Sequence, residues 1–150
     1  MTTQAAQTPV IPALLRAARG AYAGAIRRRL LDAGFDDLPR SGPFVLGGMA
    51  NHGGSAADLI RDLGVTKQAA SQLVDTLVVR GYLDRHVDAD DRRRMTIALT
   101  ERGRAAAAAV RDGVEAVDTE LARLVTPAEL AGLRAGLVAL WGIRDRMERS

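Results

Sequence analysis

The sequence has no cysteine, and only two of its 150 residues are histidine, His52 and His86. The absence of cysteine excludes disulfides, thiol redox chemistry and cysteine-ligated metals. Two histidines that lie far apart in the sequence do not make a histidine-rich metal site. We therefore expect neither a metal nor another cofactor.

Long apolar runs are also missing. No segment approaches the ~20 apolar residues that a membrane-spanning helix needs. The first ten residues, MTTQAAQTPV, lack the basic and apolar regions of a secretory signal. These absences predict a cytoplasmic protein with no membrane partner.

Aromatic residues make up only 3% of the chain, whereas hydrophobic residues make up 47%. The core must therefore consist of alanine, leucine and valine, a composition that favours helices. The pI is about 10.1, and arginine carries nearly all the positive charge because Lys67 is the single lysine. Arginine suits phosphate oxygens and guanine edges, although a GC-rich genome would also favour arginine codons.

Motifs of known enzymes are scarce. His52-Gly53-Gly54 is similar to the oxyanion loop of esterases, but no Gly-x-Ser-x-Gly elbow accompanies it. Neither a Gly-x-x-x-x-Gly-Lys phosphate loop nor a His-Glu-x-x-His metal motif occurs. We do not expect an enzyme.

Both ends of the chain carry helical apolar stripes. One predicted helix covers about residues 9–33, and a long helix capped by Thr100 is followed by a last helix that opens with a Thr126-Pro127-Ala128-Glu129 capping box. Such stripes are hard to bury within one short chain, so pairing with a second copy is the favoured solution, and packing within one chain is the alternative. The residues expected in this dimer interface are Ile11, Leu15, Leu121, Leu124, Leu133, Leu137 and Leu140.

The middle of the chain predicts two short helices joined by a tight turn. Ser55 is the expected cap of a helix that ends at Leu63, Gly64 makes the turn, and Thr66 caps a second helix that ends near Arg80. A further short helix is expected over 43–51. In the second helix of the pair the residues expected to face inward are Ala69, Ala70, Leu73, Leu77 and Val78. Those expected to face outward are Lys67, Gln68, Ser71, Gln72 and Asp75.

After Gly81 the apolar period changes to two, which predicts a β-hairpin. Pairing Leu83 with Leu99 and Val87 with Met95 brings the apolar residues together. The loop is then 88–94, which contains three consecutive arginines at 92–94. A helix with small polar residues followed by a basic ribbon is typical of proteins that grip duplex DNA.

This order of motifs resembles the MarR (multiple antibiotic resistance regulator) family of winged helix-turn-helix regulators over about residues 10–146. The motifs that carry the resemblance are Leu63-Gly64-Val65-Thr66, Leu73 to Leu77, Gly81-Tyr82-Leu83, the wing 88–93 and Leu99 to Gly103. The resemblance implies a mainly α fold with a small β-hairpin wing, in a single domain over 1–150. A winged helix-turn-helix lobe at 43–103 would lie between dimerisation helices at 9–40 and 104–150. Ala89 stands where the family often has proline, so the wing would be less stiff.

The resemblance also implies roles for individual residues. Double-stranded DNA would be contacted by Thr66, Lys67, Gln68, Ser71, Gln72, Arg92, Arg93 and Arg94. Asp91 would brace the Arg93 guanidinium, which would enter the minor groove. A pocket for a small aromatic or amphipathic effector is expected around Tyr22, Phe44, Met49 and His52, although a helix-end role is the favoured interpretation of His52.

We therefore expect a sequence-specific DNA-binding transcriptional regulator, a repressor that binds an inverted-repeat operator as a homodimer. The alternative is a winged-helix module that binds another protein and has no specific DNA binding. The arginines at 92–94 argue against this alternative, because a protein-binding wing would not need them.

Overall fold

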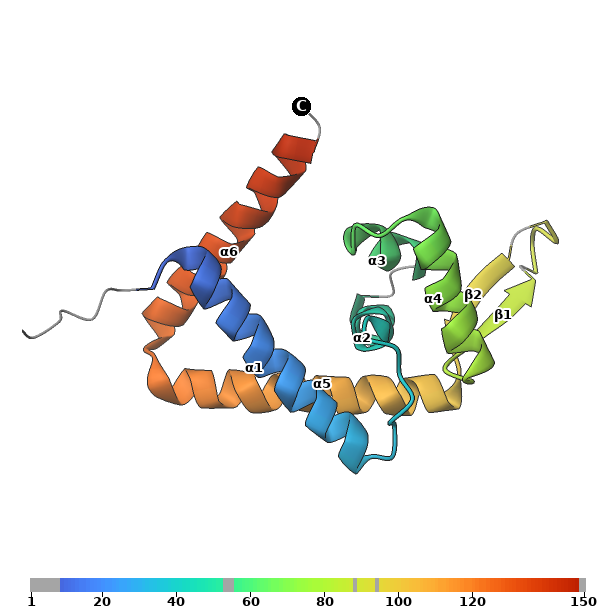
Figure 1. The fold of residues 1–150 in the computed structure, drawn as a ribbon, viewed down its shortest axis with the longest axis horizontal. Helices are drawn as coiled ribbons and strands as arrows, with labels where there is room; N and C mark the ends of the chain where they lie inside the picture. The colour runs from blue at the N-terminus through green and yellow to red at the C-terminus, as the bar shows by residue number, and fades with distance from the viewer. Residues whose placement is uncertain (1–8, 53–55, 88, 94, 149–150) are drawn as a thin grey trace, which may run out of the picture. The chain divides into compact units, whose positions relative to one another are not determined.

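The computed structural model describes residues 9–52, 56–87, 89–93 and 95–148 (Figure 1). The described residues form six helices and one two-stranded antiparallel sheet, which confirms the predicted fold class. In chain order the elements are α1 (Ile11–Asp32), α2 (Gly42–His52), α3 (Ala56–Asp62), α4 (Lys67–Val79), β1 (Leu83–Val87), β2 (Met95–Leu99), α5 (Glu101–Leu124) and α6 (Pro127–Glu148). The predicted Ser55 cap lies outside the described residues.

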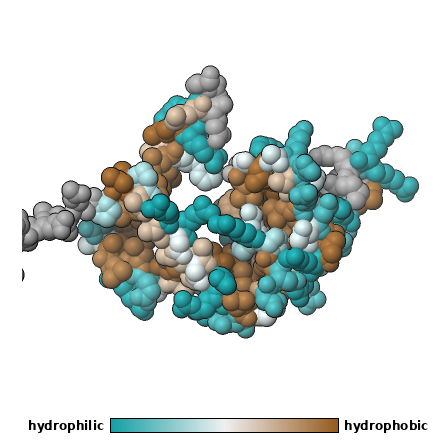
Figure 2. Space-filling model, viewed as in Figure 1, coloured by the Kyte–Doolittle hydropathy of each residue, from teal (hydrophilic) through white to brown (hydrophobic). Residues whose placement is uncertain are grey.

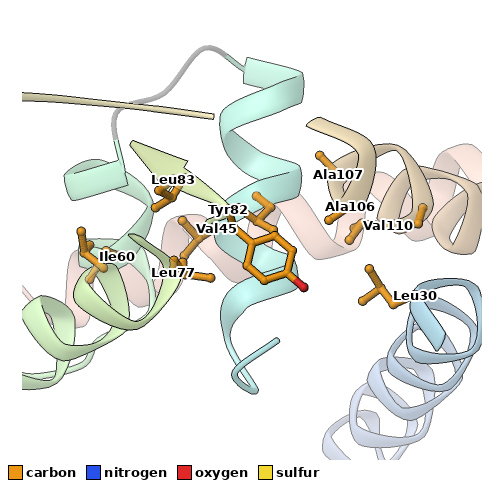
Figure 3. Close-up of a cluster of buried hydrophobic side chains, with 12 residues drawn as sticks. Leu30, Val45, Ile60, Leu77, Tyr82, Leu83, Ala106, Ala107 and Val110 are labelled. Carbon is orange, nitrogen blue, oxygen red and sulfur yellow. The ribbon is translucent and has the colours of Figure 1, made fainter. Parts of the chain in front are cut away.

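The chain divides into two compact units, Met1–Val114 and Glu115–Ser150. The core of the first unit lies between α2, α4, the hairpin and the start of α5, and Leu30 of α1 joins it (Figure 3). Tyr82 is completely buried in this core, beside Leu77. The core thus holds α4 and β1 on a common support.

The β-hairpin has the predicted register, with Leu83 opposite Leu99 and Val87 opposite Met95. The period-two pattern determines this register, because a slip by one residue would turn Leu83 out of the core. Thr100 then caps α5, since its hydroxyl accepts a hydrogen bond from the Gly103 amide at 2.9 Å.

Helix α4 has the predicted bounds to within one residue at each end, and its buried face agrees with the prediction except at two positions. Ala69 is exposed, whereas Val74, which was not among the residues expected to face inward, is buried. Leu77 is buried as expected. Ala70, Leu73 and Val78 pack partly buried against the core, as expected. Val74 lies four residues after Ala70 and three before Leu77, and therefore shares their face of the helix.

The second unit contains the end of α5 and helix α6. The predicted capping box is present, because the Thr126 amide donates to Glu129 Oε2 at 2.7 Å and the Glu129 amide donates to Thr126 Oγ1 at 3.3 Å. These bonds satisfy backbone amides that the first turn of a helix leaves without partners. None of the helices within the described residues is both long and apolar enough to cross a membrane.

Candidate nucleic-acid interface

The first turns of α4 present a polar surface to solvent. Thr66 caps the helix by accepting a hydrogen bond from the Ala69 amide at 3.2 Å. The side chains predicted to contact bases are all exposed, namely Lys67, Gln68, Ser71 and Gln72. Glutamine and lysine in such a position can donate to the base edges in a major groove.

The tip of the hairpin is basic and exposed. Arg92 and Arg93 lie in solvent, and hydrophilic side chains project from the hairpin end of the molecule in Figure 2. Arg94 lies outside the described residues. Asp91 Oδ1 accepts a hydrogen bond from the backbone amide of Arg93 at 3.0 Å. The carboxylate thus fixes the backbone of the tip, and its predicted contact with the Arg93 guanidinium stays a prediction.

An ion pair joins the wing to α4. Arg85 Nη2 of β1 donates to Asp75 Oδ1 of α4. The sequence indicated only that Asp75 faces outward. To predict this ion pair one would need to know the angle at which α4 packs against β1, and local sequence patterns do not give that angle.

A second polar cluster lies at the base of the wing. The Tyr82 hydroxyl donates to Asp37 in the segment between α1 and α2. Arg102 Nη2 of α5 donates to Asp37 Oδ1 at 3.0 Å, and Arg102 Cζ lies 4.6 Å from the centre of the Tyr82 ring. Arg80 donates to the Asp37 carbonyl oxygen. Asp37 therefore connects the end of α4, the start of β1 and the start of α5.

The electrostatics of this cluster follow from its hydrogen bonds. The Tyr82 hydroxyl, followed by the nearby Arg102, lowers the pKa of the Asp37 carboxyl. Burial, together with the bond to the Asp37 carboxylate, raises the pKa of Tyr82. Sequence reasoning missed this cluster because its members lie 45 and 65 positions from Asp37. The only local feature that could have indicated the cluster is the position of Asp37, an aspartate in a break between two predicted helices.

The residues predicted to line an effector pocket belong to α1 and α2. Met49 packs against the buried core, and Tyr22 is half-buried. Phe44 is 46% exposed. His52 is the last residue of α2, but its side chain lies outside the described residues. The effector pocket stays a prediction.

Groups of three or more side chains suited to holding a metal ion do not occur within the described residues. In the first unit α4 and the hairpin lie next to each other (Figure 1). The first turn of this helix is polar and exposed, and the tip of the hairpin is basic. Both elements rest on one core. This arrangement defines a winged helix-turn-helix lobe.

Comparison with known proteins agrees with this class. Residues 36–94 match the model of the MarR family. The match confirms the predicted resemblance to this family over the helix-turn-helix and the wing. No curated protein matches the chain.

Solved structures share the fold. Streptococcus pneumoniae FabT in complex with DNA is 18% identical with a TM-score of 0.75, over 91% of this chain and 96% of FabT. The S. aureus MepR–DNA complex is 21% identical with a TM-score of 0.69, over 90% of this chain and 98% of MepR. S. aureus MepR bound to ethidium bromide is 21% identical with a TM-score of 0.58, over 89% of this chain and 96% of MepR.

Proposed function

We propose that this protein is a sequence-specific DNA-binding transcriptional regulator that represses transcription by occupying an inverted-repeat operator as a homodimer. One observation carries the proposal: the polar first turns of α4 and the basic tip of the hairpin are both exposed on a single lobe. Two solved neighbours that contain DNA, FabT and MepR, share this fold.

In the proposed complex α4 lies in the major groove and Gln68, Ser71 and Gln72 reach base edges. The tip with Arg92 and Arg93 reaches the neighbouring minor groove or its phosphates. Each phosphate that an arginine neutralises releases counterions, so the affinity falls steeply as the salt concentration rises. Arg93 contributes to both effects.

Exposed apolar side chains support a homodimer. Ile11 of α1 is 61% exposed in the first unit, and in the second unit Leu124 of α5 and Val138 of α6 are 81% and 72% exposed. Leu15, Leu133, Leu137 and Leu140 are also exposed, while Leu121 is half-buried. Apolar side chains repeated along a helix mark a surface that a partner covers. A twofold dimer would present two α4 helices to half-sites about one helical turn apart.

Control by a small aromatic or amphipathic molecule completes the proposal. An effector would act by binding more tightly to the dimer whose two α4 helices do not fit the operator, since only differential affinity shifts an equilibrium. The structure of MepR with ethidium bromide shows that a protein of this fold binds an aromatic cation.

The test is a binding experiment with purified full-length protein. Duplexes are selected from a random-sequence library, and the affinity for the winning duplex is measured by fluorescence anisotropy over a series of salt concentrations. The variant Arg93→Ala is compared with Arg134→Ala, which removes the same charge from an exposed position of α6. We expect Arg93→Ala to weaken binding roughly tenfold and to flatten the salt dependence, and Arg134→Ala to change neither.

The outcomes separate the proposed function from its alternative. If the library yields no sequence that survives competitor DNA, the protein is not a specific DNA-binding regulator and the protein-binding winged helix is favoured. If a sequence is selected but Arg93→Ala binds it normally, the regulator stands and the role of the wing tip is wrong.

A further inference from the structure

The ion pair between Asp75 and Arg85 joins the two elements that the proposed function places in neighbouring grooves. Asp75 belongs to α4 and Arg85 is the central residue of β1. Their side chains are 57% and 43% exposed, respectively. The pair therefore lies at the surface of the lobe and not in its core.

The position of Asp75 on α4 is unfavourable for DNA binding. Asp75 lies three residues after Gln72, four after Ser71 and seven after Gln68, and these spacings place it on the same helical face. A free carboxylate on that face would repel the phosphates of a bound duplex. The bond with the Arg85 guanidinium neutralises its charge and restrains its direction.

The strand geometry directs Arg85 toward α4. Side chains alternate along a strand, so Arg85 shares a face with Leu83, which is buried in the core that α4 also lines. Asp84 and His86 occupy the opposite face, where His86 Nε2 lies 3.4 Å from Asp84 Oδ2. The contact with Asp75 is thus a consequence of the hairpin register.

The pair contributes little to stability, because exposed ion pairs are worth only about 0–1 kcal/mol. A bridge of this kind can nevertheless hold two elements at a fixed separation. Within β1, Leu83 is buried, whereas the four residues that follow are exposed. The other side-chain support of the hairpin comes from β2, where Ile97 and Leu99 pack against the core.

The geometry points to Arg85 and Asp75 as positioning residues that fix the wing relative to α4 and so set the spacing between the major-groove and minor-groove contacts. This inference rests on the proposed function. According to this inference, Arg85 promotes DNA binding by holding Asp75 and does not itself contact a phosphate. The inference also gives the acidic residue a favourable role in DNA binding, which is the opposite of what its charge alone predicts.

The experiment compares Asp75→Asn, Arg85→Gln and the exchanged pair Asp75→Arg with Arg85→Asp in the full-length protein. Affinities are measured for the duplex selected by the unchanged protein. The affinities are measured again for duplexes in which the segment under the wing is moved by one base pair relative to the segment that α4 contacts. The control is Arg123→Gln, which breaks the exposed ion pair with Glu120 in α5.

We expect Asp75→Asn and Arg85→Gln each to weaken binding to the selected duplex roughly tenfold and to reduce the preference for the original spacing. The exchanged pair should recover most of the spacing preference, and Arg123→Gln should change nothing. Thermal unfolding of all variants should remain within a few degrees of the unchanged protein.

Tighter binding by Asp75→Asn would overturn the inference, because simple charge repulsion would then dominate. An equal loss for all spacings in Arg85→Gln, without recovery in the exchanged pair, would also overturn it and identify Arg85 as a phosphate contact. If the unchanged protein selects no duplex, the proposed function itself fails, and that result is distinct from both.

Discussion

The substitution Gly103→Ala tests the junction between the wing and α5. Gly103 is buried in the first turn of α5, against the backbone of Tyr82. A methyl group at this position would come closer to the Tyr82 carbonyl oxygen than the 3.0 Å below which real Cβ contacts essentially never fall. It would also lie 3.2 Å from Leu99 Cδ2. Because the nearest atom is backbone, the clash cannot be relieved by a side-chain rotation.

The expected cost follows from three contributions. Overpacking in a well-packed core costs about 1–3 kcal/mol. The Tyr82 carbonyl accepts hydrogen bonds from the Thr100 amide and hydroxyl, both at 3.1 Å, and moving it weakens bonds worth about 1 kcal/mol each. Alanine in a helix offsets about 1 kcal/mol of this loss. The net expectation is a destabilisation of about 2–3 kcal/mol, or roughly 5–10 °C in the melting temperature.

The assay is urea denaturation at one fixed protein concentration, since a dimer has a concentration-dependent stability. The matched control is Gly132→Ala in α6, where an added Cβ would meet nothing within 4 Å. We expect the control to be stabilised by about 0.5–1 kcal/mol. If Gly103→Ala is as stable as the control, the close packing of α5 on Tyr82 is wrong.

Three further predictions concern other parts of the chain. Thr126→Ala removes the cap of α6 and should destabilise the protein by about 1 kcal/mol in urea denaturation, and an unchanged midpoint would show that the capping box is unimportant. The lowered pKa of Asp37 means that its stabilising contribution is present above its unfolded pKa of about 3.9 and is lost as the pH falls through the folded value. The stability difference between the unchanged protein and Asp37→Asn should therefore shrink below about pH 4, and a difference independent of pH would contradict the role of the carboxylate. Leu137→Glu places a charge on an apolar face of α6 and should shift the sedimentation coefficient from that of a dimer to that of a monomer, whereas an unchanged dimer would exclude this face from the interface.

The regularities that the sequence predicted correctly are local. The pairing of Leu83 with Leu99 follows from alternation within one hairpin, and the caps Thr66 and Thr100 act within three residues. Gly81 follows α4 with a φ of +75°, a left-handed conformation that glycine adopts easily because it has no Cβ. Each of these features depends on residues that are neighbours in the chain.

The buried face of α4 shows the limit of predictions from local patterns. The pattern correctly placed Ala70, Leu73, Leu77 and Val78 toward the core, but it included Ala69, which is exposed, and left out Val74, which is buried. Only the surrounding core, lined by α2 and the hairpin, sets the edges of the buried face. The helix and its inward face were predictable from the sequence, but the edges of that face were not.

By itself, then, the sequence determined the elements, their caps, the hairpin register and the basic loop, because those depend on short-range sterics and hydrogen bonds. The tertiary structure decided which side chains meet: Asp37 with Tyr82 and Arg102, and Asp75 with Arg85. Such contacts depend on how helices and strands pack in three dimensions. A polar residue in a loop or on a helix face gives no local sign of the distant partner that packing will bring to it.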